Sequence, residues 1–300
     1  MFKWNWKHLG LVAGLLLALF AAGCGSDDES SKSKSGEGSG DKKSKEIELV
    51  YVEWDSEIAS THVIGKVLED QGYDVKLTPL DNAVMWESVA KGEADGMVAA
   101  WLPATHKSQY EQYGDQVVEL GENLEGAKIG LVVPDYMDVT SIEDLDKQAD
   151  QVITGIEPGA GVVAASEQAL KDYDNLKDWT VQTSSSGAMA TELGSAIEKE
   201  EEIIVTGWTP HWKFAKYDLK YLEDPKGTFG EEETIETMVR EGLEEDMPEA
   251  YKILDQFKWT TDDMESVMLE ISNGASPEDA AAKWVEDNQD KVKEWTKNVE

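Results

Sequence analysis

Apolar and polar residues along the chain follow two alternating patterns, which predict strands and helices in turn. Residues 47–51 alternate in character as a strand does. Ser60 or Thr61 then begins a segment with apolar residues three and four positions apart, which predicts a helix that ends at Gly72. The same criteria predict a strand at 73–80, a helix at 85–91 and a strand at 96–100. This alternation is typical of α/β folds.

The same order of elements recurs in the second part of the chain. The third predicted strand of each half runs into a Trp-x-Pro sequence, at residues 101–103 and 208–210, and the two tryptophans are 107 positions apart. The second half is predicted to contain strands at 151–154, 179–183 and 203–206, a helix between 161 and 173, and a helix over Met189, Leu193 and Ile197. We therefore expect two similar α/β halves.

Two α/β halves predict a two-lobed protein with two segments that cross between the lobes. Residues 128–134 form a predicted crossover strand and residues 233–242 a returning one, with the hinge expected near Leu131 and Ile235. Such an architecture is typical of binding proteins that close around a ligand. The expected boundaries are residues 46–127 for lobe 1, with residues 235–300 returning to it, and residues 128–234 for lobe 2.

The first residues have the pattern of a targeting signal. Lys3 and Lys7 precede an apolar stretch at 9–20, which is too short for a comfortable membrane span and reads as a signal peptide of residues 1–23. Small residues then precede Cys24, and this pattern resembles a bacterial lipobox, which implies cleavage before Cys24 and lipid attachment to its sulfur. Residues 24–45 carry no large apolar side chain and are predicted to form a flexible tether.

Composition narrows the possible functions. The chain holds 62 acidic and 27 basic residues, a formal charge of -35, so a nucleic-acid partner is not expected. A hydrophobic content of 40 %, with 11 tryptophans, excludes disorder throughout the chain. Because Cys24 is the single cysteine, no internal disulfide is possible, and Arg240 is the single arginine that could clamp a ligand.

Motifs for metal, nucleotide and hydrolytic chemistry are missing. The four histidines lack the short spacing of helical metal sites, so we expect no metal and no cofactor. No Gly-x-Ser-x-Gly sequence occurs, so no catalytic residue is predicted. Residues 155–161 contain spaced glycines after a strand, without the dinucleotide spacing. They indicate either a tight turn or backbone amides at a helix N-terminus that attract an anion.

Three tryptophans stand at the ends of predicted strands. Trp54, Trp101 and Trp208 each follow a strand and adjoin a turn, in matching places of the two halves, whereas most other tryptophans fall where packing explains them. The role of Trp212 stays open. A cleft of indole faces suits a cation that cannot donate hydrogen bonds, because the ring quadrupole attracts quaternary ammonium and apolar walls accept its methyl groups.

The chain resembles a known family at three motifs. Residues 54–60 (WDSEIAS), 100–106 (AWLPATH) and 207–212 (GWTPHW) are similar to motifs of the substrate-binding lipoproteins of glycine betaine/proline betaine ABC importers. The resemblance implies a class II periplasmic-binding-protein fold. It also implies that Trp54, Trp101 and Trp208 form a prism around a trimethylammonium head, and that the ligand's carboxylate is held by His106 and the backbone amides of Gly155 and Ile156.

The family implies a non-catalytic receptor that delivers its ligand to the permease and ATPase subunits of an importer. The mature protein is expected on the extracytoplasmic face of the cell membrane, anchored by lipid, with a monomeric body. Two alternatives remain open at this stage: a surface lipoprotein hydrolase acting on choline-type esters, and an adhesin that binds polysaccharide. The motifs do not rank glycine betaine against proline betaine, carnitine or a sulfonium analogue.

Overall fold

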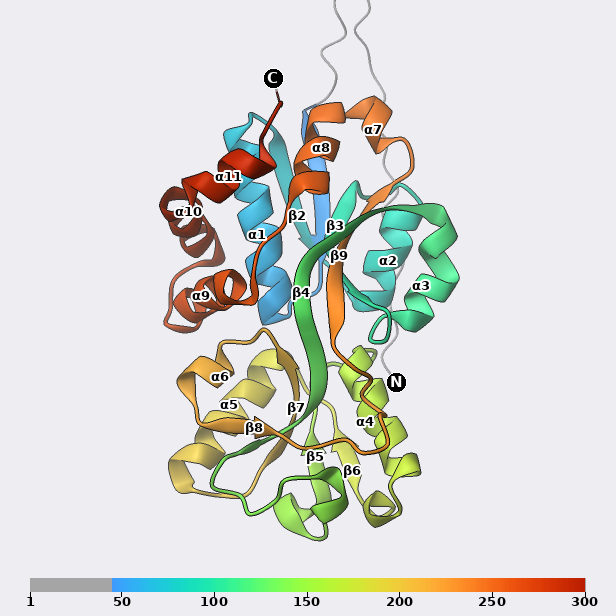
Figure 1. Ribbon diagram of the computed structural model, residues 1–300, viewed down its shortest axis with the longest axis vertical. Helices are drawn as coiled ribbons and strands as arrows, with labels where there is room; N and C mark the ends of the chain where they lie inside the picture. Colours follow the sequence, from blue (N-terminus) through green and yellow to red (C-terminus); the bar gives the residue numbers. More distant parts are fainter. Residues whose placement is uncertain (1–44, 300) are drawn as a thin grey trace, which may run out of the picture. The chain divides into compact units, whose positions relative to one another are not determined.

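Strands and helices alternate along residues 45–299, the part of the chain that the computed structural model describes (Figure 1). The predicted signal peptide, Cys24 and all but the last residue of the predicted tether lie outside the described residues. The strands are β1 Glu46–Tyr51, β2 Asp74–Pro79, β3 Gly96–Leu102, β4 Val117–Pro134, β5 Val152–Thr154, β6 Thr180–Gln182, β7 Ile204–Thr209, β8 Leu219–Tyr221 and β9 Glu233–Arg240.

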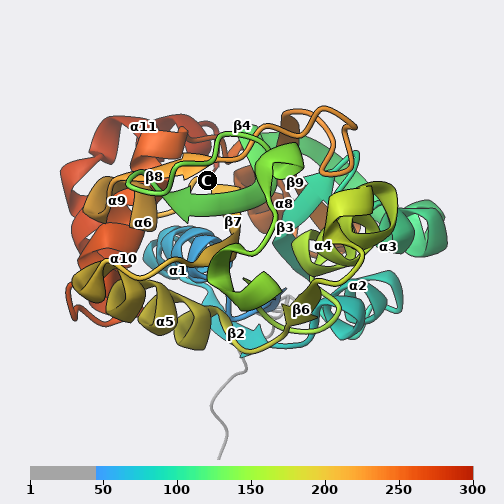
Figure 2. The same ribbon diagram turned by 90° about the horizontal axis from the view of Figure 1, so that it is seen from below.

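The helices pack around these strands. They are α1 Asp55–Asp70, α2 Asn82–Ala90, α3 Lys107–Tyr113, α4 Gly161–Asp172, α5 Ser186–Lys199, α6 Lys213–Lys216, α7 Leu243–Asp246, α8 Pro248–Gln256, α9 Thr261–Ser272, α10 Pro277–Asp287 and α11 Gln289–Trp295. Helices α1 and α9–α11 lie on one side of the upper sheet in Figure 1 and α2 and α3 on the other, whereas α4 and α5 flank the lower strands (Figures 1 and 2).

Strand β4 belongs to two sheets and so joins two lobes. The strand order is β2-β1-β3-β9-β4-β7-β5-β6, with β8 paired to β4. Residues 117–127 of β4 pair antiparallel with β9, and residues 128–134 pair antiparallel with β7 and β8. We call the part with β1, β2, β3 and β9 lobe 1, and the part with β5 to β8 lobe 2. In each lobe three strands are parallel neighbours, so their carboxyl ends meet at one edge.

The predicted crossover is part of a longer element. The predicted crossover strand at 128–134 is the second part of the strand β4, whose ladder continues from one sheet into the next. The returning segment is the strand β9, as expected. The exact lobe boundaries and the hinge near Leu131 and Ile235 stay predictions.

Helix α1 begins earlier than the sequence pattern indicates. Its first residue is Asp55 and Trp54 is the N-cap, whereas Ser60 or Thr61 was the predicted start. The first turns of α1 bury polar side chains, among them Ser56 and Glu57, so the apolar periodicity that marks a helix is missing there. The acidic residues of the first turn still suit a helix start, because their charge complements the helix dipole.

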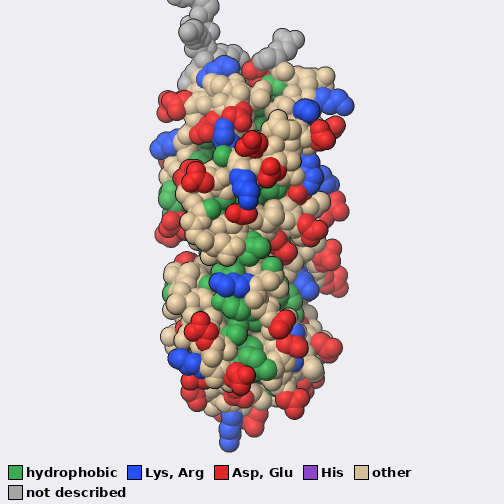
Figure 3. All heavy atoms as spheres, turned by 90° about the vertical axis from the view of Figure 1, so that its left-hand side faces the viewer, with side chains coloured by type: hydrophobic (Ala, Val, Ile, Leu, Met, Phe, Trp, Pro, Cys, Tyr) green, Lys and Arg blue, Asp and Glu red, His purple; other side chains and the backbone are tan. Residues whose placement is uncertain are grey.

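The buried apolar residues of both lobes form one connected core. The central strand β3 is buried along its whole length, as expected for a strand covered on both faces. Acidic side chains are spread over both lobes on the face shown in Figure 3, and lysines lie among them. Within residues 45–299, no helix combines the length and the hydrophobicity that a membrane crossing requires.

Candidate ligand-binding site

A small pocket lies between the lobes, with about 320 Å³ of empty space. This figure includes space that is open to solvent, and the enclosed part of the pocket is much smaller, so the ligand is expected to be small. Five of the six predicted ligand residues line the pocket: Trp54, Trp101 and His106 from lobe 1, and Ile156 and Trp208 from lobe 2. The other lining residues are Ser56, Thr105, Ile129, Ala160, Gly161 and Val162.

The three tryptophans reach the pocket from strand ends. Trp54 is the N-cap of α1, just past β1, while Trp101 and Trp208 are the next-to-last residues of β3 and β7. Their side chains are 7 %, 3 % and 3 % exposed, in the same order. Because the carboxyl ends of the parallel strands face the space between the lobes, a residue at this position in any of these strands points to the same site.

Carboxylates hold two of the three indole rings in place. Trp101 donates its Nε1–H to Glu57 Oε1 at 2.8 Å, and Trp54 donates its Nε1–H to Glu157 Oε2 at 3.0 Å. An indole N–H lies in the plane of the ring, so a partner on it occupies the ring's edge and leaves the faces open to a ligand. The Nε1–H of Trp208 has no hydrogen-bond partner among the described residues.

Glu57 is buried beside this pocket. Its side chain is 1 % exposed, and burial raises its pKa to about 7, although the hydrogen bond from Trp101 opposes the shift. Its second oxygen, Oε2, lacks a partner among the described residues. Sequence reasoning read Glu57 only as part of a motif. The signal that could have found it is an acidic residue one helical turn after Trp54, inside a segment that must be buried.

His106 presents one N–H group to the pocket. Its side chain is fully buried, and its Nδ1 accepts a hydrogen bond from the Trp101 backbone N–H at 3.1 Å. Burial lowers the pKa of His106 to about 3, so the ring is neutral near pH 7. Because Nδ1 is an acceptor, the single ring proton is on Nε2, and this N–H has no protein partner in the described part. The ring is therefore a neutral donor with an unused N–H.

Helix α4 brings backbone amides to the same pocket. Its first residues, Gly161 and Val162, line the pocket, and the N-cap Ala160 offers no side-chain hydrogen bond. The first N–H groups of a helix have no partner within it, and the helix dipole adds partial positive charge at this end. Of the two sequence interpretations of residues 155–161, the geometry therefore favours amides at a helix N-terminus.

Gly155 differs from its expected role. Its N–H donates to the Gln182 carbonyl at 2.8 Å, and Gly155 is not among the residues that line the pocket. The bond continues the parallel ladder of β5 and β6 one residue beyond Thr154. The Gly155 N–H, which was expected to hold the ligand's carboxylate, is therefore already bonded within the sheet. Ile156, one residue further, lines the pocket as expected.

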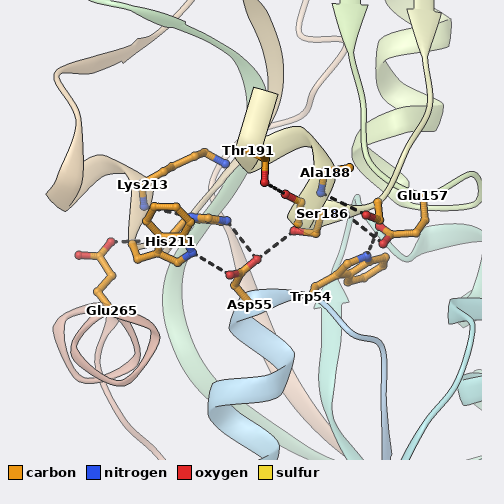
Figure 4. Close-up of polar contacts among 12 residues, drawn as sticks. Trp54, Asp55, Glu157, Ser186, Ala188, Thr191, His211, Lys213 and Glu265 are labelled. Carbon is orange, nitrogen blue, oxygen red and sulfur yellow. Dashed lines mark hydrogen bonds and ion pairs between the residues drawn. The ribbon is translucent and has the colours of Figure 1, made fainter. Parts of the chain in front are cut away.

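Carboxylates also join the two lobes around the pocket, as Figure 4 shows. Asp55 of lobe 1 accepts hydrogen bonds from lobe 2, at 2.7 Å from Trp212 Nε1 and at 2.9 Å from Ser186 Oγ, and its Oδ2 lies 3.5 Å from His211 Nε2. Glu157 of lobe 2 accepts from Trp54 of lobe 1 and from the Ser186 backbone N–H at 3.1 Å. Each lobe thus gives a carboxylate to an indole of the other, and we call this pair of contacts the latch.

The latch depends on an ionised Asp55. Burial would raise the pKa of this carboxyl, but the His211 ring at 3.5 Å and the hydrogen bonds from Trp212 and Ser186 lower it well below its usual range. Burial lowers the pKa of His211 to about 4, so this imidazole is neutral near pH 7. Sequence reasoning left Trp212 open and did not single out Asp55, Glu157 or Ser186, because their partners lie in the other lobe.

No cluster of three or more His, Cys, Asp or Glu side chains within residues 45–299 has a geometry suited to a metal ion. The pocket is lined by indole rings, one imidazole and the residues at the start of α4.

Known proteins share this sequence and fold. The glycine betaine/carnitine transport binding protein GbuC of Listeria monocytogenes is 52 % identical over 159 residues, which are 53 % of this chain and 53 % of GbuC. The chain thus spans about half the length of this curated relative.

Two solved structures match this chain over nearly the whole of their own length. Lactococcal OpuAC in its closed-liganded conformation with glycine betaine has a TM-score of 0.82 and 60 % identity, over 84 % of this chain and 99 % of that chain. The glycine/betaine/L-proline-binding protein ProX from Borrelia burgdorferi has a TM-score of 0.81 and 35 % identity, over 84 % of this chain and 97 % of that chain. These neighbours confirm the expected two-lobed periplasmic-binding-protein fold.

The model of the OpuAC family, described as the substrate-binding domain of ABC-type glycine betaine transport systems, matches residues 45–287. Since this match covers well over half of the chain, the chain belongs to that family of substrate-binding domains.

Proposed function

We propose that this protein captures glycine betaine, or a closely related quaternary ammonium zwitterion, between its lobes and delivers it to an ABC importer. The observation that carries the proposal is the composition of the pocket. Three indole rings and one neutral imidazole line it together with small and apolar residues, and none of the lining side chains carries a formal charge near pH 7. A site without net charge suits a ligand that has both charges and no net charge.

The rings account for the cationic end of the ligand. Trp54, Trp101 and Trp208 surround the trimethylammonium head, which cannot donate a hydrogen bond and so depends on ring faces and apolar contact. Each face contributes about 0.5–2 kcal/mol, and three faces with buried methyl groups are consistent with micromolar affinity, about -8 kcal/mol.

The unused donors account for the carboxylate. His106 Nε2–H, the Ile156 backbone and the first amides of α4 lie around the same pocket. Together they satisfy a carboxylate without a full counter-charge. Gly155 is left out of this set because its N–H is used by Gln182.

Calorimetry with a ligand series tests the proposal. Glycine betaine should bind with micromolar affinity, and choline at least tenfold more weakly. Choline lacks the carboxylate and leaves buried donors unpaired, at about 1–3 kcal/mol each. Carnitine, proline betaine and a neutral sugar complete the series. Equal affinity for choline and betaine would refute the carboxylate site, and tight sugar binding would support the adhesin alternative instead.

The location follows from the sequence together with the family. We propose that residues 1–23 are a signal peptide, that Cys24 is lipidated, and that residues 24–45 tether a monomeric body to the extracytoplasmic face of the membrane. The proposed lobes are residues 46–127 with 235–300, and residues 128–234. The protein itself then performs no catalysis, and ATP hydrolysis belongs to the importer's own subunits.

A further inference from the structure

Lys213 is a buried cation with no hydrogen-bonding partner. It is the first residue of α6, its side chain is fully buried, and its Nζ makes no hydrogen bond to the described residues. Lysines are almost never fully buried unless they are paired. No other lysine within residues 45–299 belongs to the buried set.

The Nζ of Lys213 lies on the face of a pocket tryptophan. It is 4.3 Å from the ring centroid of Trp208 and 5.7 Å from that of Phe214. The Lys213 backbone N–H donates to His211 Nδ1 at 3.1 Å, and this bond fixes the start of α6 and therefore the root of the side chain. In its charged form, Lys213 engages the ring quadrupole that a ligand cation would use.

The three pocket rings are unequal in this respect. Trp54 and Trp101 each donate their N–H to a carboxylate, which adds negative potential to the ring, whereas Trp208 Nε1 has no partner among the described residues. Two of the rings are thus prepared to attract a cation, and the third already contacts one.

Few charges oppose or support the ammonium. On α1, the carboxylate of Asp55 favours the charged form of Lys213, but burial dominates and lowers the pKa of Lys213 to about 7. His211, in the loop before α6, is neutral near pH 7, and Glu265 of α9 accepts from its backbone N–H at 3.4 Å. Beyond Phe214 lie Tyr221 of β8, which stacks on that ring, and Lys128 of β4, whose Nζ is 4.3 Å from the Tyr221 ring centroid.

We propose that the Lys213 ammonium and the ligand's quaternary ammonium compete for Trp208, so that ligand capture drives a proton from Lys213 to the solvent. The proposal rests on the proposed function, because it requires a cationic ligand at the Trp208 ring that Lys213 also contacts. Two cations that contact one buried ring repel each other, and only Lys213 can lose its charge. Affinity for betaine should then rise with pH while Lys213 deprotonates.

Calorimetry in buffers of different ionisation enthalpy measures the released proton. At pH 7 the wild-type protein should release up to about half a proton per betaine, since roughly half of the Lys213 side chains are charged when the pH equals the pKa. The dissociation constant should fall by about three- to tenfold between pH 6 and pH 8. One titrating group changes the affinity by at most tenfold for each pH unit below its pKa, and only the range from pH 6 to about pH 7 lies below the pKa of Lys213.

Two variants show whether the released proton comes from Lys213. Lys213→Met keeps the length and the apolar body of the side chain and should abolish the Lys213 share of the release. Lys216→Met is the matched control, since Lys216 is exposed, is on the same helix and has its Nζ over the Trp212 ring at 5.2 Å. Burial raises the pKa of Glu57 to about 7 as well, and a bound cation would favour its ionised form. The proton release of Lys213 is therefore the difference between the wild type and Lys213→Met.

A second measurement needs no variant. In the wild type with ¹³Cε-labelled lysine, the resonance that titrates near pH 7 should shift its pKa downward when glycine betaine is saturating. An unchanged lysine pKa, or equal proton release in the wild type and Lys213→Met, would overturn the proposal. Betaine binding without proton exchange overturns the competition alone and leaves the proposed function standing. If no betaine binds at all, both fail.

Discussion

Trp212 of lobe 2 donates its indole N–H to Asp55 of lobe 1 at 2.7 Å, across 157 positions of sequence. Trp54 of lobe 1 makes the reverse contact, to Glu157 of lobe 2 at 3.0 Å. Trp54 therefore belongs to both features: its indole N–H makes one contact of the latch, and its side chain also lines the pocket. We therefore expect closure of the lobes to be coupled to the geometry of the proposed cation cage.

Asp55→Ala should weaken betaine binding by about 1.5–3 kcal/mol, roughly 10- to 150-fold, because it removes charge-assisted hydrogen bonds that form only when the lobes are closed. Calorimetry measures the effect. The matched control is Asp74→Ala, at an exposed aspartate of the same lobe, which should leave the affinity unchanged. Equal affinities for the wild type and Asp55→Ala would show that the latch does not contribute to closure.

Replacing any one of Trp54, Trp101 and Trp208 by Ala should cost about 1–3 kcal/mol of betaine binding, because each change removes one wall of the cage. Phe at the same position should cost less, since it keeps an aromatic face with a weaker quadrupole. Tryptophan fluorescence and calorimetry report both effects. The cage would be wrong if all three Ala variants bound betaine as the wild type does.

Gly161→Ala should hold the lobes apart. A Cβ at Gly161 would clash with the backbone oxygen of Thr105 in the other lobe, and a backbone atom cannot move aside as a flexible side chain can. We expect at least a tenfold loss of betaine affinity and no compaction on ligand addition, whereas the wild type should become more compact, as small-angle scattering can measure.

Gly187→Ala is the matched control for this wedge. Gly187 is also in the first turn of a helix, α5, and a Cβ there would meet nothing within 4 Å. This variant should bind and compact like the wild type. If Gly161→Ala compacts equally well, the closed arrangement is not the one that holds the ligand.

Buried histidine should make stability depend on pH. The pKa of His106 falls from 6.5 to about 3 on folding, so between these values the unfolded chain binds the extra proton and the wild type loses stability as the pH falls. His106→Gln should remove up to about 1.4 kcal/mol per pH unit from this dependence. Urea unfolding of both proteins at pH 7.5, 6 and 5 gives the difference. Parallel curves would mean that folding does not change the pKa of His106.

Cys24→Ser should abolish lipid attachment and release the body from the membrane. Metabolic labelling with a fatty acid, followed by fractionation, measures both. Residual label on the Cys24→Ser protein would place the anchor elsewhere. The body from Glu46 onward should then run as a monomer in size-exclusion chromatography.

Local patterns in the sequence were enough to predict the alternating elements and the three pocket tryptophans. Alternation along a strand and apolar spacing along a helix are properties of one short segment, and they need no knowledge of its neighbours. The carboxyl ends of parallel strands meet at one edge, so Trp54, Trp101 and Trp208 could be placed together from the chain alone.

Only the tertiary structure decided which polar groups are free and which are used. The Gly155 amide is taken by Gln182 and the indole of Trp54 by Glu157, over a separation of 103 positions. Helix α1 begins at Asp55, whose carboxylate accepts hydrogen bonds from the other lobe. The spacing of apolar residues, which the prediction used, carries no information about such a polar start. Lys213 likewise looks like a surface lysine in sequence, and packing against Trp208 and Phe214 makes it a buried cation. A hydrogen bond or a burial penalty depends on groups that folding brings together from distant parts of the chain, and for that reason the local pattern does not contain it.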